Sequence, residues 1–148
     1  MKKKYDALKL ENQLCFPLYA VSKEIVRRYK PFLDEIDLTY TQYITMMVLW
    51  ESKQMSVKGL GEKLYLDSGT LTPLLKRLEQ KGLLTRQRDS RDERILMVSI
   101  TKSGEKLKEQ AIKVPEKMMG CVPLEAEDAK ELYQILHKMM DGFHREEK

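Results

Sequence analysis

The stretch from Ser56 to Ile100 decides the fold: SVKGLGEKLYLDSGTLTPLLKRLEQKGLLTRQRDSRDERILMVSI. It begins with two helical patterns that only the Tyr65-Leu66 link separates, and it continues with two strand patterns on either side of a charged turn. In the second helical pattern, leucines at spacings of three and four form one apolar stripe: Leu71, Leu74, Leu75 and Leu78. This order predicts a helix-turn-helix followed by a β-hairpin wing.

The polar face of the second predicted helix is suited to nucleic acid. Short hydroxyl side chains and cations lie off the leucine stripe, and such side chains reach base edges and phosphates. The candidates over a major groove are Ser68, Thr70, Thr72 and Lys76, and Arg77 is a candidate for phosphate. The alternative is a pair of ordinary core helices with a solvated outer face.

The predicted wing is basic. Its strands are expected over residues 83–88 and 95–100, and from Lys76 to Arg94 the sequence has seven cations against four anions. A basic hairpin beside a polar helix suits phosphates and a minor groove, which makes Arg86 and Arg88 further phosphate candidates. A solvated charged turn is the alternative for the segment between the strands.

These residues resemble the winged helix-turn-helix of the MarR family of bacterial repressors. The run LDSGTLTPLLKRLE, residues 66–79, is similar to the recognition helix of the family's thiol-based redox branch, and Asp92-Glu93-Arg94 is similar to the family's wing signature. The resemblance extends over nearly the whole chain. It implies a mainly α fold with a small β-wing, in which Arg94 enters the minor groove and Asp92 orients it.

Size and charge bound the remaining possibilities. With 148 residues, 42% of them hydrophobic and 34% charged, the chain is expected to form one structural domain. The net charge of +4 permits nucleic-acid binding without establishing it. Because no apolar run approaches a membrane span and the lysine-rich start lacks the apolar segment of a signal peptide, we expect a cytoplasmic protein with no membrane partner.

Helical patterns flank the winged region on both sides. A helix is predicted over residues 10–29, where Lys30-Pro31 ends it, and a long helix over residues 101–119 is expected to bend at Pro115. The last helix is predicted over residues 125–143. A further helix is expected to begin at Tyr40, with Thr39 and Gln42 as its capping box and Tyr43, Ile44, Met47 and Val48 as its inner face.

The terminal helices have broad apolar faces that need a cover. A homodimer provides one if the terminal helices of two copies interleave about a twofold axis, and it presents two recognition helices to a palindromic double-stranded operator. We therefore divide the domain into a dimerisation and sensor helix (1–38), a winged DNA-binding region (39–100) and C-terminal dimerisation helices (101–148). An intramolecular bundle is the alternative.

Cys15 is a candidate reactive thiol. If its helix starts at Asn12, Cys15 lies in the first turn, where the helix dipole favours a thiolate. Tyr29 lies on nearly the same helix face but fourteen residues away, roughly 21 Å along the axis, so it cannot reach the thiol of its own helix. We therefore predict that Cys15 of one chain meets Tyr29 and Tyr40 of the other. The alternatives are a small buried cysteine and ordinary tyrosine packing.

The run Gln13-Leu14-Cys15-Phe16, taken with the two tyrosines, resembles the organic-hydroperoxide-sensing repressors of the MarR family. The resemblance implies that Cys15 is the peroxide sensor and that Tyr29 and Tyr40 hydrogen-bond it across the dimer. Tyr19 is a further candidate for this pocket. Pro17 departs from the expected pattern beside the sensor.

Cys121 decides the subtype that this resemblance implies. In members with two cysteines, the sensor forms a disulfide with a cysteine near the end of the long fifth helix of the partner chain, and Cys121 lies in that region. In members with one cysteine, a small external thiol caps the oxidised sulfur. Cys121 is then an unrelated loop thiol.

Three other functions compete with a redox repressor. A MarR-like repressor controlled by a small phenolic ligand keeps the fold and changes the signal. A thiol peroxidase has little support, since His137 and His144 lie seven residues apart, a spacing that suits neither metal chelation nor a paired cysteine. An interaction protein that uses the fold without DNA is the third. We expect no enzyme activity, no metal and no cofactor.

Overall fold

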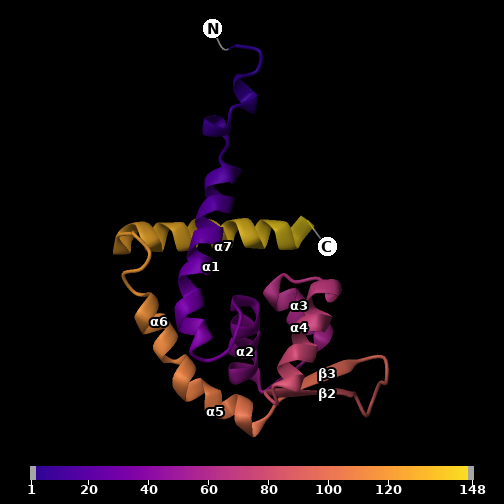
Figure 1. Ribbon diagram of the computed structural model, residues 1–148. Helices are drawn as coiled ribbons and strands as arrows, with labels where there is room; N and C mark the ends of the chain where they lie inside the picture. The colour runs from indigo at the N-terminus through magenta and orange to yellow at the C-terminus, as the bar shows by residue number, and fades with distance from the viewer. Residues whose placement is uncertain (1–2, 147–148) are drawn as a thin grey trace.

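The computed structural model describes residues 3–146 and is mainly helical, with a small three-stranded sheet (Figure 1). The wing projects from one side of the molecule, and the segment before the first α-helix extends away from the rest. The elements are two 3-10 turns (Asp6–Leu8 and Leu10–Asn12), α1 (Cys15–Asp34), α2 (Tyr40–Ser52), β1 (Gln54–Ser56), α3 (Val57–Leu64), α4 (Ser68–Gln80), β2 (Leu84–Arg88), β3 (Leu96–Ile100), α5 (Lys102–Ala111), α6 (Lys113–Met118) and α7 (Ala126–Glu146).

The predicted winged helix-turn-helix is confirmed. Ser56 caps α3 by accepting a hydrogen bond from the Gly59 amide at 3.0 Å, and Tyr65 turns the chain with a left-handed φ of 56°. Gly82 ends α4 with a φ of 77°, a conformation that glycine adopts without a Cβ penalty. The β2 and β3 strands then pair antiparallel, with Leu84 opposite Ile100.

The sequence did not predict β1. It has three residues and pairs with the free edge of β3, with Gln54 opposite Ser99. Three residues are too few for an alternating pattern to be recognised. The sheet order is therefore β1-β3-β2, which places β3, the strand with the buried Val98, at the centre.

The core forms where α2 meets the helix-turn-helix. All four leucines of the predicted α4 stripe are buried, and α2 begins at Tyr40 with the predicted Thr39–Gln42 capping box. The buried side of α2 is wider than the predicted inner face: Tyr43 and Val48 are buried as predicted, Met46 is fully buried, and Met47 is 45% exposed. The prediction for Met47 was wrong because α2 packs against α1, α3, α4 and α5 together, so a single apolar stripe does not describe its burial.

The first helix lies later in the chain than predicted. It starts at Cys15, because the side-chain Nδ2 of Asn12 donates to the Asp6 carbonyl and holds the preceding segment in a tight turn. It continues through Pro31 to Asp34, since the last turn buries Leu33 to 2% exposure against the core. That burial offsets the backbone hydrogen bond that proline removes.

The predicted long helix after the wing is two helices. Thr101 caps α5, as the hydrogen bond from the Gly104 amide at 3.1 Å shows. The break falls at Ile112, three residues before Pro115. Proline has no amide hydrogen to donate to the carbonyl four residues earlier, that of Ala111, so the helical hydrogen bonding is interrupted there and restarts in α6.

Both terminal helices leave apolar side chains uncovered. Leu33 is the only residue buried within α1, and none is buried within α7. The exposed apolar side chains of the two helices are Phe16, Leu18, Tyr19, Val21 and Val26 on α1 and Tyr133, Ile135, Leu136, Met139, Met140 and Phe143 on α7.

Among the described residues, no helix has the length and apolar character needed to cross a membrane.

Candidate functional site

The outer face of α4 presents hydroxyl and amino groups to solvent. Ser68, Thr72 and Lys76 recur every four residues on the side away from the leucines, and Thr70 lies at the edge of that face. All four are exposed. The Asp67 carboxylate accepts the Thr70 amide at 2.7 Å, and this hydrogen bond lowers the pKa of Asp67 below its ordinary 3.8. The cap fixes the start of the helix that carries the polar face.

At the tip of the wing, Asp92 holds Arg94 in a two-pronged ion pair. Arg94 Nε lies 3.0 Å from Asp92 Oδ1 and Nη2 lies 3.0 Å from Oδ2. The ion pair fixes the direction of the guanidinium. Because the Arg94 side chain is 91% exposed, the guanidinium also remains open to solvent. The charge-assisted hydrogen bonds lower the pKa of Asp92 and raise that of Arg94.

The three arginines predicted to bind phosphate have different surroundings. Arg86 is paired with Glu79 of α4 at 3.1 Å, and its backbone amide donates to the same carboxylate at 2.9 Å. Arg86 therefore fastens the wing to α4, and its charge is matched within the chain. Arg88 is exposed on β2, and Arg77 lies on α4 beside a pocket.

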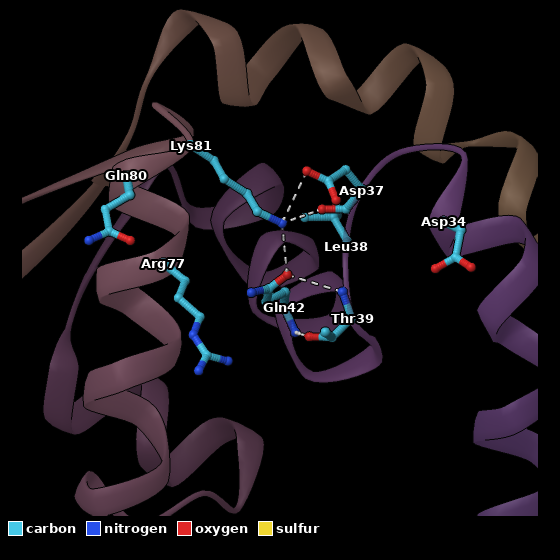
Figure 2. A pocket seen from close by; sticks show the side chains of 8 residues that line it. All are labelled: Asp34, Asp37, Leu38, Thr39, Gln42, Arg77, Gln80 and Lys81. Carbon is cyan, nitrogen blue, oxygen red and sulfur yellow. Dashed lines mark hydrogen bonds and ion pairs between the residues drawn. The ribbon is translucent and has the colours of Figure 1, made fainter.

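This pocket, of about 400 Å³, lies between the end of α4 and the start of α2 (Figure 2). Lys81 crosses it, donating to the backbone carbonyl of Asp37 and, at 3.3 Å, to the side chain of Gln42. Lys81 therefore joins the recognition helix to the loop between α1 and α2. Sequence reasoning missed this role, because the partners are about forty residues away in the chain.

Tyr29 and Tyr40 come together within one chain. Their ring centroids are 5.0 Å apart, and the ring of Tyr43 lies 6.0 Å from Tyr29 and 6.4 Å from Tyr40. Burial, with neighbouring phenols as a smaller cause, raises the pKa of Tyr29 and of Tyr43, so both remain protonated hydrogen-bond donors at neutral pH. Adjacent phenols of this kind can hold a small anionic acceptor.

The two cysteines lie in different surroundings. Cys15 is exposed at the first residue of α1, and Tyr19, one turn later, is exposed with Lys23 5.1 Å from its ring centroid. Cys121 is half-buried in the loop after α6, where its thiol lies 3.3 Å from the Lys117 carbonyl. The Arg28 guanidinium donates to the Cys121 carbonyl, so α1 holds this loop at Arg28.

Comparisons with known proteins agree with this geometry. The family model for the transcriptional regulator SarA/Rot matches residues 27–111. The organic hydroperoxide resistance transcriptional regulator of Bacillus subtilis is 48% identical over 145 residues, which cover 98% of this chain and 99% of that protein. This chain belongs to the MarR family, in the branch of the organic hydroperoxide resistance regulators. The predicted family and the prediction of a transcriptional regulator rather than an enzyme are confirmed.

Other similar proteins are also transcriptional regulators or DNA-bound structures. The regulator SarZ of Staphylococcus aureus is 40% identical over 131 residues, covering 88% of each chain. The structure of reduced AbfR bound to DNA superimposes with a TM-score of 0.80 at 32% identity, covering 99% of this chain and 100% of that one. A disulfide form of AbfR superimposes with a TM-score of 0.63 at 36% identity. These neighbours confirm the predicted winged fold.

Proposed function

We propose that this protein is a dimeric repressor that binds a palindromic operator and releases it when an organic hydroperoxide oxidises Cys15. The observation that carries the proposal is the separation of the two halves of one site. An exposed thiol begins α1, and a close pair of phenols, Tyr29 and Tyr40, begins fourteen residues later in the chain at Tyr29. About 21 Å of helix separates Cys15 from Tyr29, so a second copy must bring them together.

A twofold axis accounts for this separation. Ser22 lies midway between Cys15 and Tyr29, so two antiparallel α1 helices that cross at Ser22 bring each thiol level with the other chain's Tyr29. The same crossing covers apolar side chains that are exposed in one chain, such as Leu18 and Val26. A small side chain at the crossing point lets the helices approach closely.

The chemistry in this pocket is nucleophilic. The Cys15 thiolate, which phenol donors stabilise, attacks one peroxide oxygen and breaks the O–O bond. Sulfur is oxidised to a sulfenic acid, and the leaving alkoxide takes a proton to become an alcohol. A thiol then attacks the sulfenic sulfur, which forms an S–S bond and releases water.

We propose Cys121 of the partner as that second thiol. Arg28 holds the Cys121 loop to α1, the helix that carries Tyr29, so we infer that the chain that supplies the phenols also supplies the second cysteine. Closing a disulfide between groups that start more than about 7 Å apart between Cα atoms requires backbone movement. That movement shifts the terminal helices and changes the spacing of the two recognition helices. Capping by an external thiol is the competing outcome.

On DNA, we assign the outer face of α4 to the major groove and Arg94 to the minor groove. Ser68, Thr70, Thr72 and Lys76 are exposed there, and the ion pair with Asp92 keeps Arg94 directed outward. Arg77 and Arg88 are assigned to phosphates. Arg86 contributes less than these two, because Glu79 already matches its charge.

An operator titration tests the proposal. The operator is selected from random duplexes with the reduced protein, and its dissociation constant is measured with and without cumene hydroperoxide. The native protein should lose the operator on oxidation, and C15S should not. C121S should still be oxidised at Cys15 but should give no crosslinked dimer on non-reducing electrophoresis. Retention of the operator by fully oxidised native protein contradicts the proposal.

A repressor controlled by a small phenolic ligand is the second candidate. A cavity of about 920 Å³ lies between the helix-turn-helix and the end of α7, lined in part by Tyr65, Leu66 and His144. Its lining combines apolar and aromatic side chains with polar ones such as Lys58 and Ser68, a mixture that suits a phenol. Mass spectrometry after one equivalent of cumene hydroperoxide separates the candidates, because a repressor that responds only to a ligand shows no selective oxidation of Cys15.

A further inference from the structure

We propose that Trp50 is a positioning residue that couples the tyrosine pair, Tyr29 and Tyr40, to the base of the wing through α2. The inference rests on the proposed function, because it presupposes that a change at Cys15 alters DNA binding. It adds the route inside each chain by which that change reaches the DNA-binding surface. The route consists of one aromatic contact and one buried hydrogen bond.

The first part of the route is an aromatic cluster along α2. Tyr43 contacts both Tyr29 and Tyr40, and on its other side its ring lies 6.4 Å from Trp50 at an interplanar angle of 70°. Tyr43 is 4% exposed and Trp50 is 8% exposed. Because buried rings of this size are closely packed, a reorientation of Tyr29 or Tyr40 displaces Tyr43 and then Trp50.

The second part is a directional bond from Trp50 to the start of α5. The indole Nε1 donates to the Gly104 carbonyl at 2.8 Å in a buried environment. Gly104 is closely packed, since a Cβ built on it would lie 2.3 Å from the Leu83 carbonyl and 2.7 Å from Ile100. Leu83 and Ile100 are the residues at which the wing leaves and rejoins the body of the protein.

Two further contacts clamp the same end of α2. The Ile100 amide donates to the Lys53 carbonyl at 2.9 Å, and the Lys53 amino group pairs with Glu105 at 2.6 Å. The N-terminal half of α2 therefore contacts the tyrosine pair, and its C-terminal end is attached to α5 and β3. A shift of the helix cannot be absorbed at either end, because both ends are packed or hydrogen-bonded.

The test compares operator affinity before and after oxidation. W50F keeps an aromatic ring and removes the indole donor. Reduced W50F should bind the operator within about threefold of native, and Cys15 should be oxidised at the native rate. The ratio of oxidised to reduced dissociation constants should fall by about fivefold or more, the scale of one hydrogen bond. An unchanged ratio in folded W50F overturns the inference.

S52A is the matched control. It removes a hydrogen bond from the same end of α2, that from Ser52 to the Val48 carbonyl at 2.8 Å, which has no link to α5. S52A should keep the native ratio. A fall in S52A equal to that in W50F shows that any loosening of α2 has the same effect, and this also overturns the specific role of Trp50.

Intrinsic fluorescence gives a second readout that needs no variant of Trp50. Trp50 is the single tryptophan of the chain, so its emission reports this junction alone. Oxidation with cumene hydroperoxide should shift or quench the emission of the native protein and leave that of C15S unchanged. Release of the operator without a change in emission overturns the inference, whereas a native protein that keeps its operator when oxidised overturns the proposed function itself.

Discussion

Single residues fix the junctions of this molecule, and Gly104 is the tightest of them. It lies at the start of α5, and the carbonyl of Leu83 occupies the space where a side chain would begin. The carbonyl of Gly104 accepts a hydrogen bond from the indole of Trp50. A residue without Cβ is therefore required where α2, α5 and the wing converge.

We predict that G104A lowers the free energy of unfolding by about 3 kcal/mol or more, because the added methyl group cannot be accommodated without moving the backbone. Urea denaturation measures the loss. G142A is the control, since a Cβ at Gly142 in α7 meets nothing within 4 Å. Alanine there should raise stability by about 0.5–1 kcal/mol. Similar stability of G104A and native protein would show that the junction has room to relax.

The Asp92–Arg94 ion pair leads to a prediction for DNA binding. R94A should weaken operator binding by about tenfold or more, and R94K should recover little of it, since lysine cannot form the two-pronged contact. Fluorescence anisotropy at fixed salt measures both. R27A removes an exposed arginine of α1 that pairs with Glu24 and should bind within about twofold of native. Full recovery in R94K would indicate that only the charge matters.

At the scale of elements, side-chain caps and prolines set the ends of the helices. Four helices begin after a residue whose side chain accepts a hydrogen bond from the backbone amide three residues later. These capping residues are Thr39, Ser56, Asp67 and Thr101. Prolines act according to position. Pro17 and Pro115 lie in the first turn of α1 and α6, where their missing amide hydrogen is not needed, whereas Pro73 lies inside α4.

The Asp67 cap gives a pH dependence. Its folded pKa is lowered, so its contribution to stability is fully present above the ordinary value of 3.8 and is lost as pH falls through the lowered folded value. D67N keeps a capping side chain that does not titrate. The urea midpoint of the native protein should therefore fall relative to that of D67N as pH drops below 3.8. A difference that stays constant across this range would exclude a role for the charge.

Pro73 and Pro115 should respond differently to replacement. P73A restores a backbone hydrogen bond to the Gly69 carbonyl inside α4 and should raise the free energy of unfolding by about 1 kcal/mol or more. P115A should change it by less than about 0.5 kcal/mol, because Pro115 lies in the first turn of α6. Urea denaturation with circular dichroism compares them. An equal gain in both variants would contradict the positional explanation.

At the scale of the whole molecule, a single chain leaves the apolar faces of α1 and α7 exposed to solvent. One chain exposes large side chains such as Ile135, Met139 and Phe143 along α7. Exposed apolar surface of this extent marks an interaction site, and the proposed dimer covers it with the same helices of a second copy. A single recognition helix with its wing binds only half of a palindromic operator.

We predict that the double variant I135D/M139D is monomeric in analytical ultracentrifugation at concentrations where the native protein is a dimer, since two buried charges have no partners in the interface. Its operator affinity should fall by about a hundredfold or more. K138D, a charge reversal between the two sites on α7, should remain dimeric. A double variant that still sediments as a dimer would place the interface elsewhere.

The sequence by itself determined the winged helix-turn-helix, because its signals are local. The signals are the leucine stripe of α4, the Thr39–Gln42 capping box, the glycine at position 82 and the apolar run of β3, and each depends on residues a few positions apart. The family resemblance of this region rested on residues 66–79 and 92–94, which are also local runs. The predicted ends of α1 were wrong, because the burial of Leu33 and the side-chain hydrogen bond of Asn12 depend on residues outside the local pattern.

Only the tertiary structure decided which distant groups meet. It brought Tyr29 to Tyr40, Arg28 to the Cys121 loop, Lys81 to Asp37 and Trp50 to Gly104. No periodicity encodes such contacts, since they depend on how helices pack after they have formed. The sequence identified a candidate reactive thiol and the helix-turn-helix, and packing determined which residues lie between them.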